Sequence, residues 1–316
     1  MTRYCSALLF LVMTTAAAAA GPGGRPDLQG VWSFASGVPL QRPMKFAGRK
    51  TLTKEEFDKQ RAGMLGILGL VAQFAPVENV QLEWIDNTLY VEDLRTSLIT
   101  YPDNGRLPAL VDGVTRAPGV EDIFEMLSNA NGNPAALGSL AAAFAGSRKN
   151  NYTDFSREQR CLTTLPVPLV PQFSDSYVQI IQARDSVALV TDGERRVIPI
   201  SDTPAAPGRV RLSTGTSIGH WEGDTLVVET KNFSARTIGF AGAGNSRDKV
   251  VTERFTRTAA GLQYAATVVD PSTFKDRIEL SFPMARVDSR IYEASCHEGN
   301  YSLANALSAN RKEEQQ

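Results

Sequence analysis

Apolar and polar residues alternate over most of the second half of the chain, a period-two pattern typical of strands with one buried face. Turn residues separate the alternating segments, as at Arg184-Asp185 and Asp192-Gly193. About ten to twelve short strands at such spacing favour an antiparallel barrel or sandwich over a parallel sheet. The predicted strands of this half, besides the hairpin described next, are 177–182, 187–190, 195–200, 250–258, 261–269, 277–282 and 290–296.

The clearest hairpin is predicted at 218–230, where Gly223-Asp224 forms the turn between two β-branched and aromatic runs. With a two-residue loop, Glu222 faces Thr225 across the hairpin, and alternation then separates the remaining side chains into two faces. One face, predicted to be core, carries Trp221, Leu226 and Val228. The other face carries His220, Glu222, Val227 and Glu229.

The first half mixes strands with helices. Residues 26–34 read as the entry to a first strand, and 82–91 and 95–110 as hairpins turning at Asp86-Asn87 and Asn104-Gly105. Gly30 and Trp32 there form a Gly-x-Trp pair that resembles the opening of lipocalins and other calycin barrels, or marks a core Trp at the start of any sheet.

Helical segments are predicted at three places. A capping box, Thr53 with Glu56, starts a helix that runs to about 75 and whose part at 64–74 is nearly all apolar. Two short helices are expected within 120–147, and a last one at 303–312. The first two regions are interpreted as insertions near 53–75 and 120–147 that cover the sheet.

Length and composition fit one large domain over 21–316. The 316 residues are 42% apolar, which is enough for a full hydrophobic core. The 33 basic and 34 acidic residues give a net charge of -1 without any basic block. We therefore expect no nucleic-acid partner and no polybasic membrane contact; the oligomeric state stays open.

Residues 1–20 are predicted to be a signal peptide, because Arg3, a short apolar run and a small-residue tail ending at Ala20 follow in the required order. We therefore expect a secreted or periplasmic protein that leaves the membrane after cleavage. Cleavage leaves Cys161 and Cys296, and two thiols in an oxidising compartment most simply form one disulfide. A thiol nucleophile or a metal-ligating cysteine is the alternative.

The chemical candidates centre on the chain's 2 histidines, His220 and His297. Four interpretations are open. One is a metal site, zinc or iron, with carboxylates such as Glu222, Glu298 or Asp224, although no metal-ligand spacing supports it. The others are acid-base chemistry by a His-Glu pair, ligand binding by the same side chains, and a purely structural role. No cofactor is expected.

Further ligand-binding candidates are Trp221, Glu229, Arg95 and Tyr301. Arginines in β proteins commonly form structural ion pairs, and one of them, Arg95, is a candidate for an anionic ligand group. Because Glu253 and Arg254 are neighbours on a predicted strand, they point to opposite faces and do not pair with each other. Serine-hydrolase, P-loop and dinucleotide-binding motifs are lacking in this sequence.

Several motifs resemble a family of exported bacterial proteins without a settled activity. The resemblance spans about 26–307, and it implies export and a shared fold but no catalytic role. The motifs are Asp27-Leu-Gln-Gly-Val-Trp32, Arg95-Thr-Ser-Leu-Ile99 with Pro102 and Gly105-Arg-Leu-Pro108, Arg160-Cys-Leu162, Trp221-Glu-Gly-Asp-Thr-Leu-Val-Val-Glu-Thr230 with Asn232-Phe233, and Cys296-His-Glu-Gly-Asn-Tyr301.

The sequence thus predicts a mainly β protein, an antiparallel meander closing into a calycin- or lipocalin-like barrel with short helical insertions. The first functional hypothesis is that the barrel encloses a small apolar or aromatic molecule and performs cofactor-free lyase, isomerase or hydrolase chemistry with His220, His297, Glu298 and Glu222. A non-catalytic periplasmic small-molecule binding protein is the alternative. A structural or interaction protein of the envelope is the third hypothesis, and it predicts an exposed apolar patch and no sizeable pocket.

Overall fold

The fold is described from a computed structural model of the chain. The residues that it describes are 20–59, 62, 92–116, 151–155, 160–162, 166–171, 176–203, 210–293, 295–298 and 300–313.

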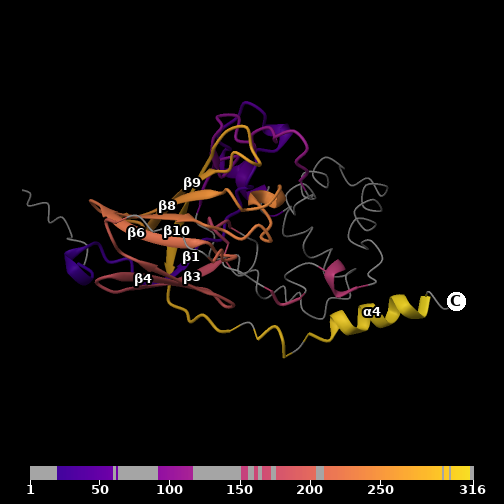
Figure 1. Cartoon of the computed structure of the whole chain (residues 1–316). Helices are drawn as coiled ribbons and strands as arrows, with labels where there is room; N and C mark the ends of the chain where they lie inside the picture. The colour runs from indigo at the N-terminus through magenta and orange to yellow at the C-terminus, as the bar shows by residue number, and fades with distance from the viewer. Residues whose placement is uncertain are drawn as a thin grey trace, which may run out of the picture.

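The described residues form one mainly antiparallel sheet of 10 strands, with a single long helix at the C-terminal end (Figure 1). The helix is α4, Ser302–Glu313. The strands are β1 Gly30–Ser33, β2 Ile99–Tyr101, β3 Tyr177–Gln182, β4 Ser186–Val190, β5 Arg195–Pro199, β6 Thr216–Glu222, β7 Thr225–Lys231, β8 Val250–Arg257, β9 Leu262–Val269 and β10 Ile278–Val287.

Two meanders make up the sheet, and β1 joins them. The strand order is β5-β4-β3-β1-β10-β9-β8-β7-β6, with β2 pairing separately along β10. β1 lies between β3 and β10 and is antiparallel to both. It therefore connects two groups of hairpin-linked strands that do not pair with each other directly. A strand from the N-terminal region thereby holds the second half of the chain together.

The sheet is curled but not closed, so the prediction of a closed barrel is wrong for the described strands. The two end strands, β5 and β6, approach each other at Ile200, which forms one bridge with Gly219. There the Ser201 N–H donates to the Gly219 carbonyl at 2.8 Å. β5 itself pairs only with β4, which leaves a seam between β5 and β6.

Side chains of the sheet itself line its inner face, and most of them are buried. Alternate residues of nearly every strand are buried, as the pattern of buried and half-buried positions along β9 illustrates. Trp32 lies at the centre, fully buried, and its indole N–H donates to the Leu28 carbonyl at 2.9 Å. An aromatic row crosses the sheet, made of Phe255, Tyr264, Phe282 and Phe34.

The predicted hairpin at 218–230 is confirmed in register as well as in position. Glu222 faces Thr225, His220 faces Val227, and Gly219 faces Val228. The turn needs glycine, because Gly223 has φ of +56°. The other predicted strands of the second half are confirmed except 290–296, although β10 continues to Val287. The capping box of Thr53 with Glu56 and the last helix are also confirmed.

Two strand predictions are wrong. Residues 290–296 alternate in polarity, but the described residues among them form no strand, because the chain leaves the sheet after β10. The 95–110 segment turns near Asn104-Gly105 as predicted, yet β2 pairs with β10 and not with the residues that return from the turn. Leu110 instead forms a bridge with Phe274.

Several predictions lie outside the described residues. These are the signal peptide predicted at 1–20, of which only Ala20 is described, the apolar segment at 64–74, the hairpin at 82–91 and the helices within 120–147. Residues 54–59 do begin a helix after Thr53. Among the helices that are described, none is long and apolar enough to cross a membrane.

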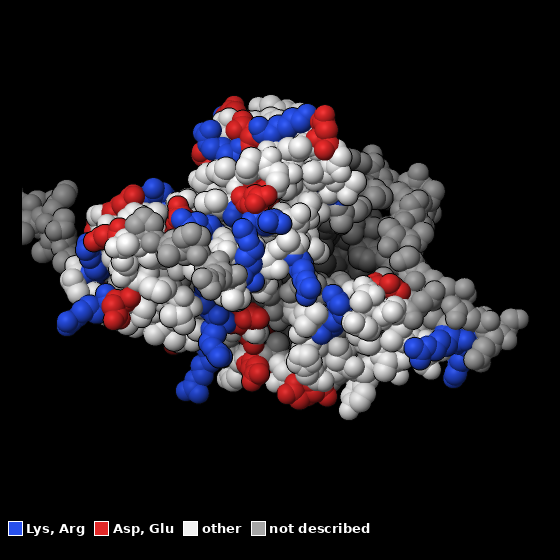
Figure 2. All heavy atoms as spheres, in the orientation of Figure 1, with Lys and Arg blue, Asp and Glu red and all other residues white. Residues whose placement is uncertain are grey.

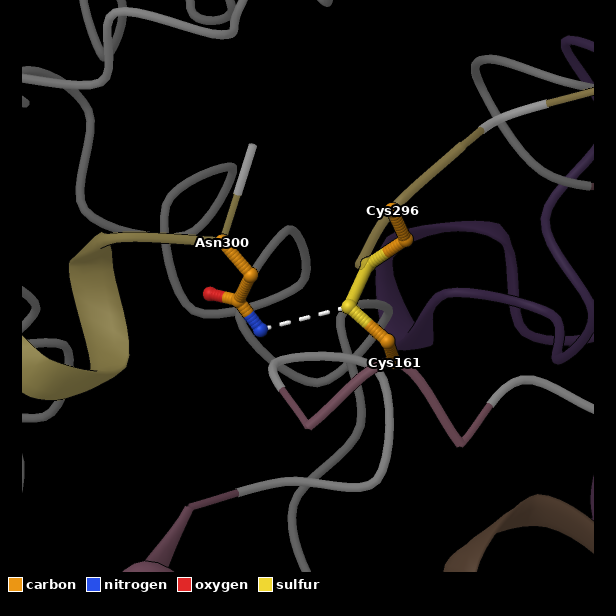
Figure 3. The surroundings of a disulfide bond; sticks show 3 residues. All are labelled: Cys161, Cys296 and Asn300. Atoms are coloured by element: carbon orange, nitrogen blue, oxygen red, sulfur yellow. Dashed lines mark hydrogen bonds between the residues drawn. A yellow bond between two sulfur atoms is a disulfide. The ribbon is translucent and has the colours of Figure 1, made fainter. Parts of the chain in front are cut away.

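The predicted disulfide is confirmed. Cys161 and Cys296 lie with their Cα atoms 5.6 Å apart and are bonded through sulfur (Figure 3). The Asn300 side-chain amide contacts the Cys161 sulfur at 3.2 Å. The bond ties the middle of the chain to the segment that leads from β10 to α4.

Candidate functional site

One predicted His-Glu pair forms on the outer face of the sheet. His220 of β6 lies 3.2 Å from Glu222 (Nε2 to Oε1), and the second Glu222 oxygen accepts from Arg254 of β8 at 2.7 Å. The side chains are 39%, 49% and 46% exposed. The Arg254 guanidinium, followed by His220, lowers the pKa of Glu222. Figure 2 shows acidic and basic side chains interspersed over the face in view.

These three side chains also have a structural role. Val227 lies between His220 and Arg254 in one cross-strand row, and it is buried although it belongs to the outer face. Glu222 on β6 reaches Arg254 on β8, so their ion pair spans β7. We interpret the group as a polar cover over Val227, because side chains as exposed as these do not enclose a substrate for proton transfer.

The structure does not join His297 and Glu298 to this group. Both are exposed in the turn that follows Cys296, and among the described contacts none links either of them to His220 or Glu222. Tyr301 is 73% exposed at the start of the C-terminal helix. The disulfide anchors this turn.

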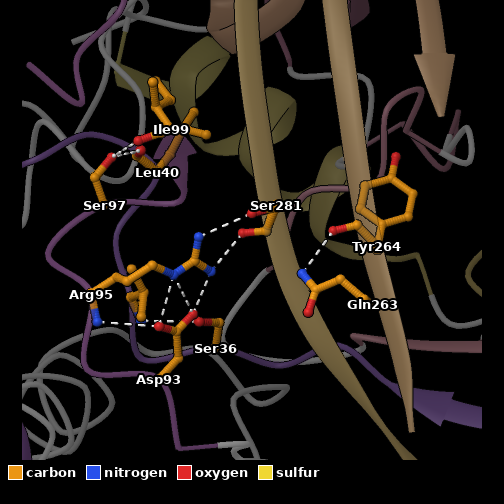
Figure 4. Close-up of polar contacts among 10 residues, drawn as sticks. Ser36, Leu40, Asp93, Arg95, Ser97, Ile99, Gln263, Tyr264 and Ser281 are labelled. Atoms are coloured by element: carbon orange, nitrogen blue, oxygen red, sulfur yellow. Dashed lines mark hydrogen bonds and ion pairs between the residues drawn. The ribbon is translucent and has the colours of Figure 1, made fainter. Parts of the chain in front are cut away.

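Arg95 connects the segment before β2 to β10. Its guanidinium contacts the Asp93 carboxylate and also donates to the Ser281 hydroxyl and carbonyl on β10, at 3.0 Å and 2.7 Å (Figure 4). All of its groups shown there point to protein atoms, which accounts for the residue without an anionic ligand.

The last two candidates are also accounted for by protein contacts. Glu229 accepts from Lys231 on the same strand at 2.8 Å. Trp221 packs against the core, with the Arg25 guanidinium 6.0 Å from its ring.

The described residues contain no group of three or more His, Cys, Asp or Glu side chains arranged to hold a metal ion. His220 has one carboxylate beside it, and His297 lies in a separate turn. The geometry therefore supplies no set of ligands for the predicted zinc or iron alternative within this part of the chain.

A buried polar chain crosses the inner face of the sheet, and sequence analysis missed it. The Leu169 N–H donates to the Tyr264 hydroxyl at 2.9 Å, and that hydroxyl donates to Glu253 Oε1 at 2.9 Å. Glu253 Oε2 accepts from Arg196 Nη2 at 2.7 Å. The Glu253 and Arg196 side chains are 0% and 4% exposed, so this ion pair is shielded from solvent.

Arg196 is only partly satisfied by this chain. Its Nε and Nη1 atoms are buried and have no hydrogen-bond partner among the atoms of the structure described here. A buried N–H group without an acceptor costs about 1–3 kcal/mol, and more when the group is charged. Glu253, in contrast, has each oxygen engaged by a donor.

Lys249, one residue before β8, is a second buried cation. Its Nζ donates to the Val167 carbonyl at 2.9 Å and lies 4.3 Å from the centre of the Phe233 ring. Burial lowers the pKa of Lys249 to about 8, against the raising effects of Asp270 and Glu253. Burial, followed by the charge of Glu253, raises the pKa of Tyr264, which keeps its phenol protonated.

The segment 166–171 packs against this inner face as a strap. Leu169 is fully buried within the core, and the strap is held by hydrogen bonds to Tyr264 and Lys249. It follows Cys161 closely along the chain, so the disulfide lies near its N-terminal end.

The sequence did contain a pattern that could have located Glu253 and Arg196. Glu253 lies two residues from Val251 and Phe255, and Arg196 lies two residues from Ile198. Both charged residues therefore share the phase of buried apolar neighbours on their strands. A charged residue in a core phase predicts a buried partner, because isolated buried charges are strongly disfavoured.

A surface cleft of about 570 Å³ lies elsewhere, between the β4–β5 turn and residues 291–293. Asp192, Glu194, Arg195 and Tyr292 contribute to its walls. It contains neither histidine nor any member of the buried polar chain.

Comparison with known proteins adds no further constraint. No known protein family, curated protein or solved structure matches this chain.

Proposed function

We propose that this chain is an exported, non-catalytic protein that binds a small apolar molecule on the inner face of its curled sheet. Export is supported by the signal-like N-terminal sequence and by the disulfide between Cys161 and Cys296, since such bonds persist in oxidising compartments. The resemblance to a family of exported bacterial proteins points the same way. A calycin-like relationship of the sheet would agree with a binding role, as an analogy of fold.

One observation supports ligand binding most directly, namely the two buried Arg196 nitrogens without an acceptor in the described structure. Buried polar groups in native proteins are nearly always hydrogen-bonded, so such an exception calls for a cause. A guest with an acceptor group would complete the hydrogen bonding. The aromatic row beside Tyr264 would contact its apolar part.

A binding role is favoured over catalysis because the inner-face groups are poorly suited to proton transfer. Each Glu253 oxygen already accepts a hydrogen bond, and the raised pKa of Tyr264 keeps its proton in place. Acid-base chemistry by His220 and Glu222 is the second candidate function, favoured by their 3.2 Å contact. It predicts that His220→Ala abolishes turnover of a substrate that the wild-type protein converts.

The binding proposal is tested on disulfide-intact protein exported by its own leader. Native mass spectrometry should detect a co-purified small molecule, and solvent-extracted protein should bind the neutral fluorophore N-phenyl-1-naphthylamine in a saturable, one-to-one manner. Arg254→Met is the matched control, because it removes an outer-face arginine that also pairs with a glutamate. Absence of both a co-purified mass and saturable fluorescence would overturn the proposal.

A further inference from the structure

We propose that the guest of the inner face presents a neutral hydrogen-bond acceptor to Arg196, as in a ketone, ester, lactone or amide, and that ionised carboxylic acids bind poorly. This inference rests on the proposed binding function and specifies the chemistry of its ligand.

The buried polar residues offer fewer hydrogen-bond acceptors than their donors need. Arg196 Nη2 uses one Glu253 oxygen, and the Tyr264 hydroxyl uses the other. Lys249 donates to the Val167 carbonyl. The Nε and Nη1 atoms of Arg196 remain as buried donors without an acceptor among the described residues. A guest that offers oxygen acceptors therefore complements the site, whereas an ammonium group would bring donors and no acceptor.

Charge favours a neutral acceptor over an anion. Arg196 is already paired with one carboxylate at 2.7 Å, inside a region that is shielded from solvent. The second buried cation, Lys249, interacts electrostatically with Asp270 and Glu253. An ionised guest would place a further negative charge near Glu253, where weak solvent screening strengthens repulsion. A carbonyl oxygen meets the need of the free N–H groups without that charge.

The body of the guest is expected to be apolar and preferably aromatic. The Tyr264 ring lies 5.1 Å from the Phe255 ring and 4.7 Å from the Phe282 ring, between centroids. Leu189 lies directly opposite Arg196 on the neighbouring strand and is fully buried. Leu169 of the strap is also buried here and bonds to Tyr264, so the guest would take up space beside or in place of its side chain.

Three ligands of similar shape test this inference on the wild-type protein, so the result does not depend on a variant that folds. They are 2-acetylnaphthalene, 2-ethylnaphthalene and 2-naphthoate, measured at pH 7 by displacement of N-phenyl-1-naphthylamine. We expect 2-acetylnaphthalene to bind about 10- to 100-fold more tightly than 2-ethylnaphthalene, because a hydrogen bond to a charged donor is gained. We expect 2-naphthoate to bind most weakly.

Variants then assign the effect to Arg196. Arg196→Lys should reduce the preference for the ketone while 2-ethylnaphthalene binds as before, and Arg254→Met should leave all three affinities unchanged. Arg196→Met combined with Glu253→Gln avoids leaving a carboxylate without a partner, and it should abolish the preference. A lowered carbonyl stretching frequency of bound 2-acetylnaphthalene would report the hydrogen bond directly.

The possible failures are distinguishable. Equal binding of 2-acetylnaphthalene and 2-ethylnaphthalene overturns the inference but leaves the binding function in place. The tightest binding by 2-naphthoate overturns it in favour of an anion site. Binding of neither the fluorophore nor any naphthalene, with no co-purified mass, overturns the proposed function itself.

Discussion

Replacement of Lys249 by methionine tests the energetic description of the inner face. The Lys249 pKa of about 8 lies below the ordinary value of 10.5 because burial disfavours the charged amine. Between these two pH values the unfolded chain binds more protons than the folded chain, so folded-state stability rises with pH. The full difference corresponds to about 3 kcal/mol, which the charged form costs at and below pH 7.

Tyr264 sets the upper pH limit of the measurement. Over pH 7 to 9.5 the contribution of Lys249 should increase stability by about 2 kcal/mol. Above pH 10 the raised pKa of Tyr264 acts in the opposite direction, because the folded protein then retains a proton that the unfolded chain releases. The pH rise is therefore expected to flatten or reverse beyond that point.

The assay is urea unfolding of the wild-type protein and Lys249→Met, followed by tryptophan fluorescence at half-unit pH steps without reductant. The difference in unfolding free energy between the two proteins should change by about 2 kcal/mol in favour of wild type from pH 7 to 9.5. Loss of the hydrogen bond to Val167 shifts the variant by a constant amount and leaves this slope intact. Lys275→Met, which removes an exposed lysine, is the control. Parallel wild-type and Lys249→Met curves would refute the reasoning.

Three further predictions concern stability. Cys161→Ser opens a loop of 135 residues and should lower unfolding free energy by about 5 kcal/mol on the chain-entropy model, and wild type with reductant should then unfold at the variant's urea midpoint. Arg95→Ala should cost about 2–4 kcal/mol because it leaves the Asp93 carboxylate largely buried without its partner, and rescue by Arg95→Lys would contradict the forked contact. Gly261→Ala should destabilise more than Gly223→Ala in thermal unfolding, because its Cβ would lie 2.3 Å from the Met284 carbonyl oxygen, whereas Gly223 faces open space. Equal melting temperatures would refute this.

The local sequence pattern was sufficient to predict strands and their register where tight turns join the strands. In the β6–β7 hairpin, a Gly-Asp turn and two alternating runs determined even the pairing of His220 with Val227. The burial of Val227 could not be read from alternation, because it depends on the long Arg254 side chain from a third strand. Alternation along a strand predicts which face of the sheet a side chain lies on. Whether that side chain is buried also depends on side chains from distant parts of the chain that cover it.

Non-local pairing explains the errors. The position of β1 between β3 and β10 depends on residues more than 140 positions apart, and no local pattern encodes that choice. Residues 290–296 alternate like a strand, but alternation alone does not supply a neighbouring strand, and the described residues among them are unpaired in the sheet. The predicted meeting of His220 with His297 likewise required a tertiary contact that the described residues do not provide.

Stabilisation of the fold alone does not explain the buried Arg196–Glu253 ion pair. Replacing such a pair by well-packed apolar residues is often neutral or stabilising, because desolvation offsets the attraction between the charges. Two Arg196 nitrogens without an acceptor in the described structure increase that cost. Arg196 lies on β5, the end strand of the sheet, and Glu253 lies on β8, so the pair joins strands that are far apart in the strand order. A buried donor that is costly to desolvate and incompletely satisfied is what selective recognition of an acceptor group requires.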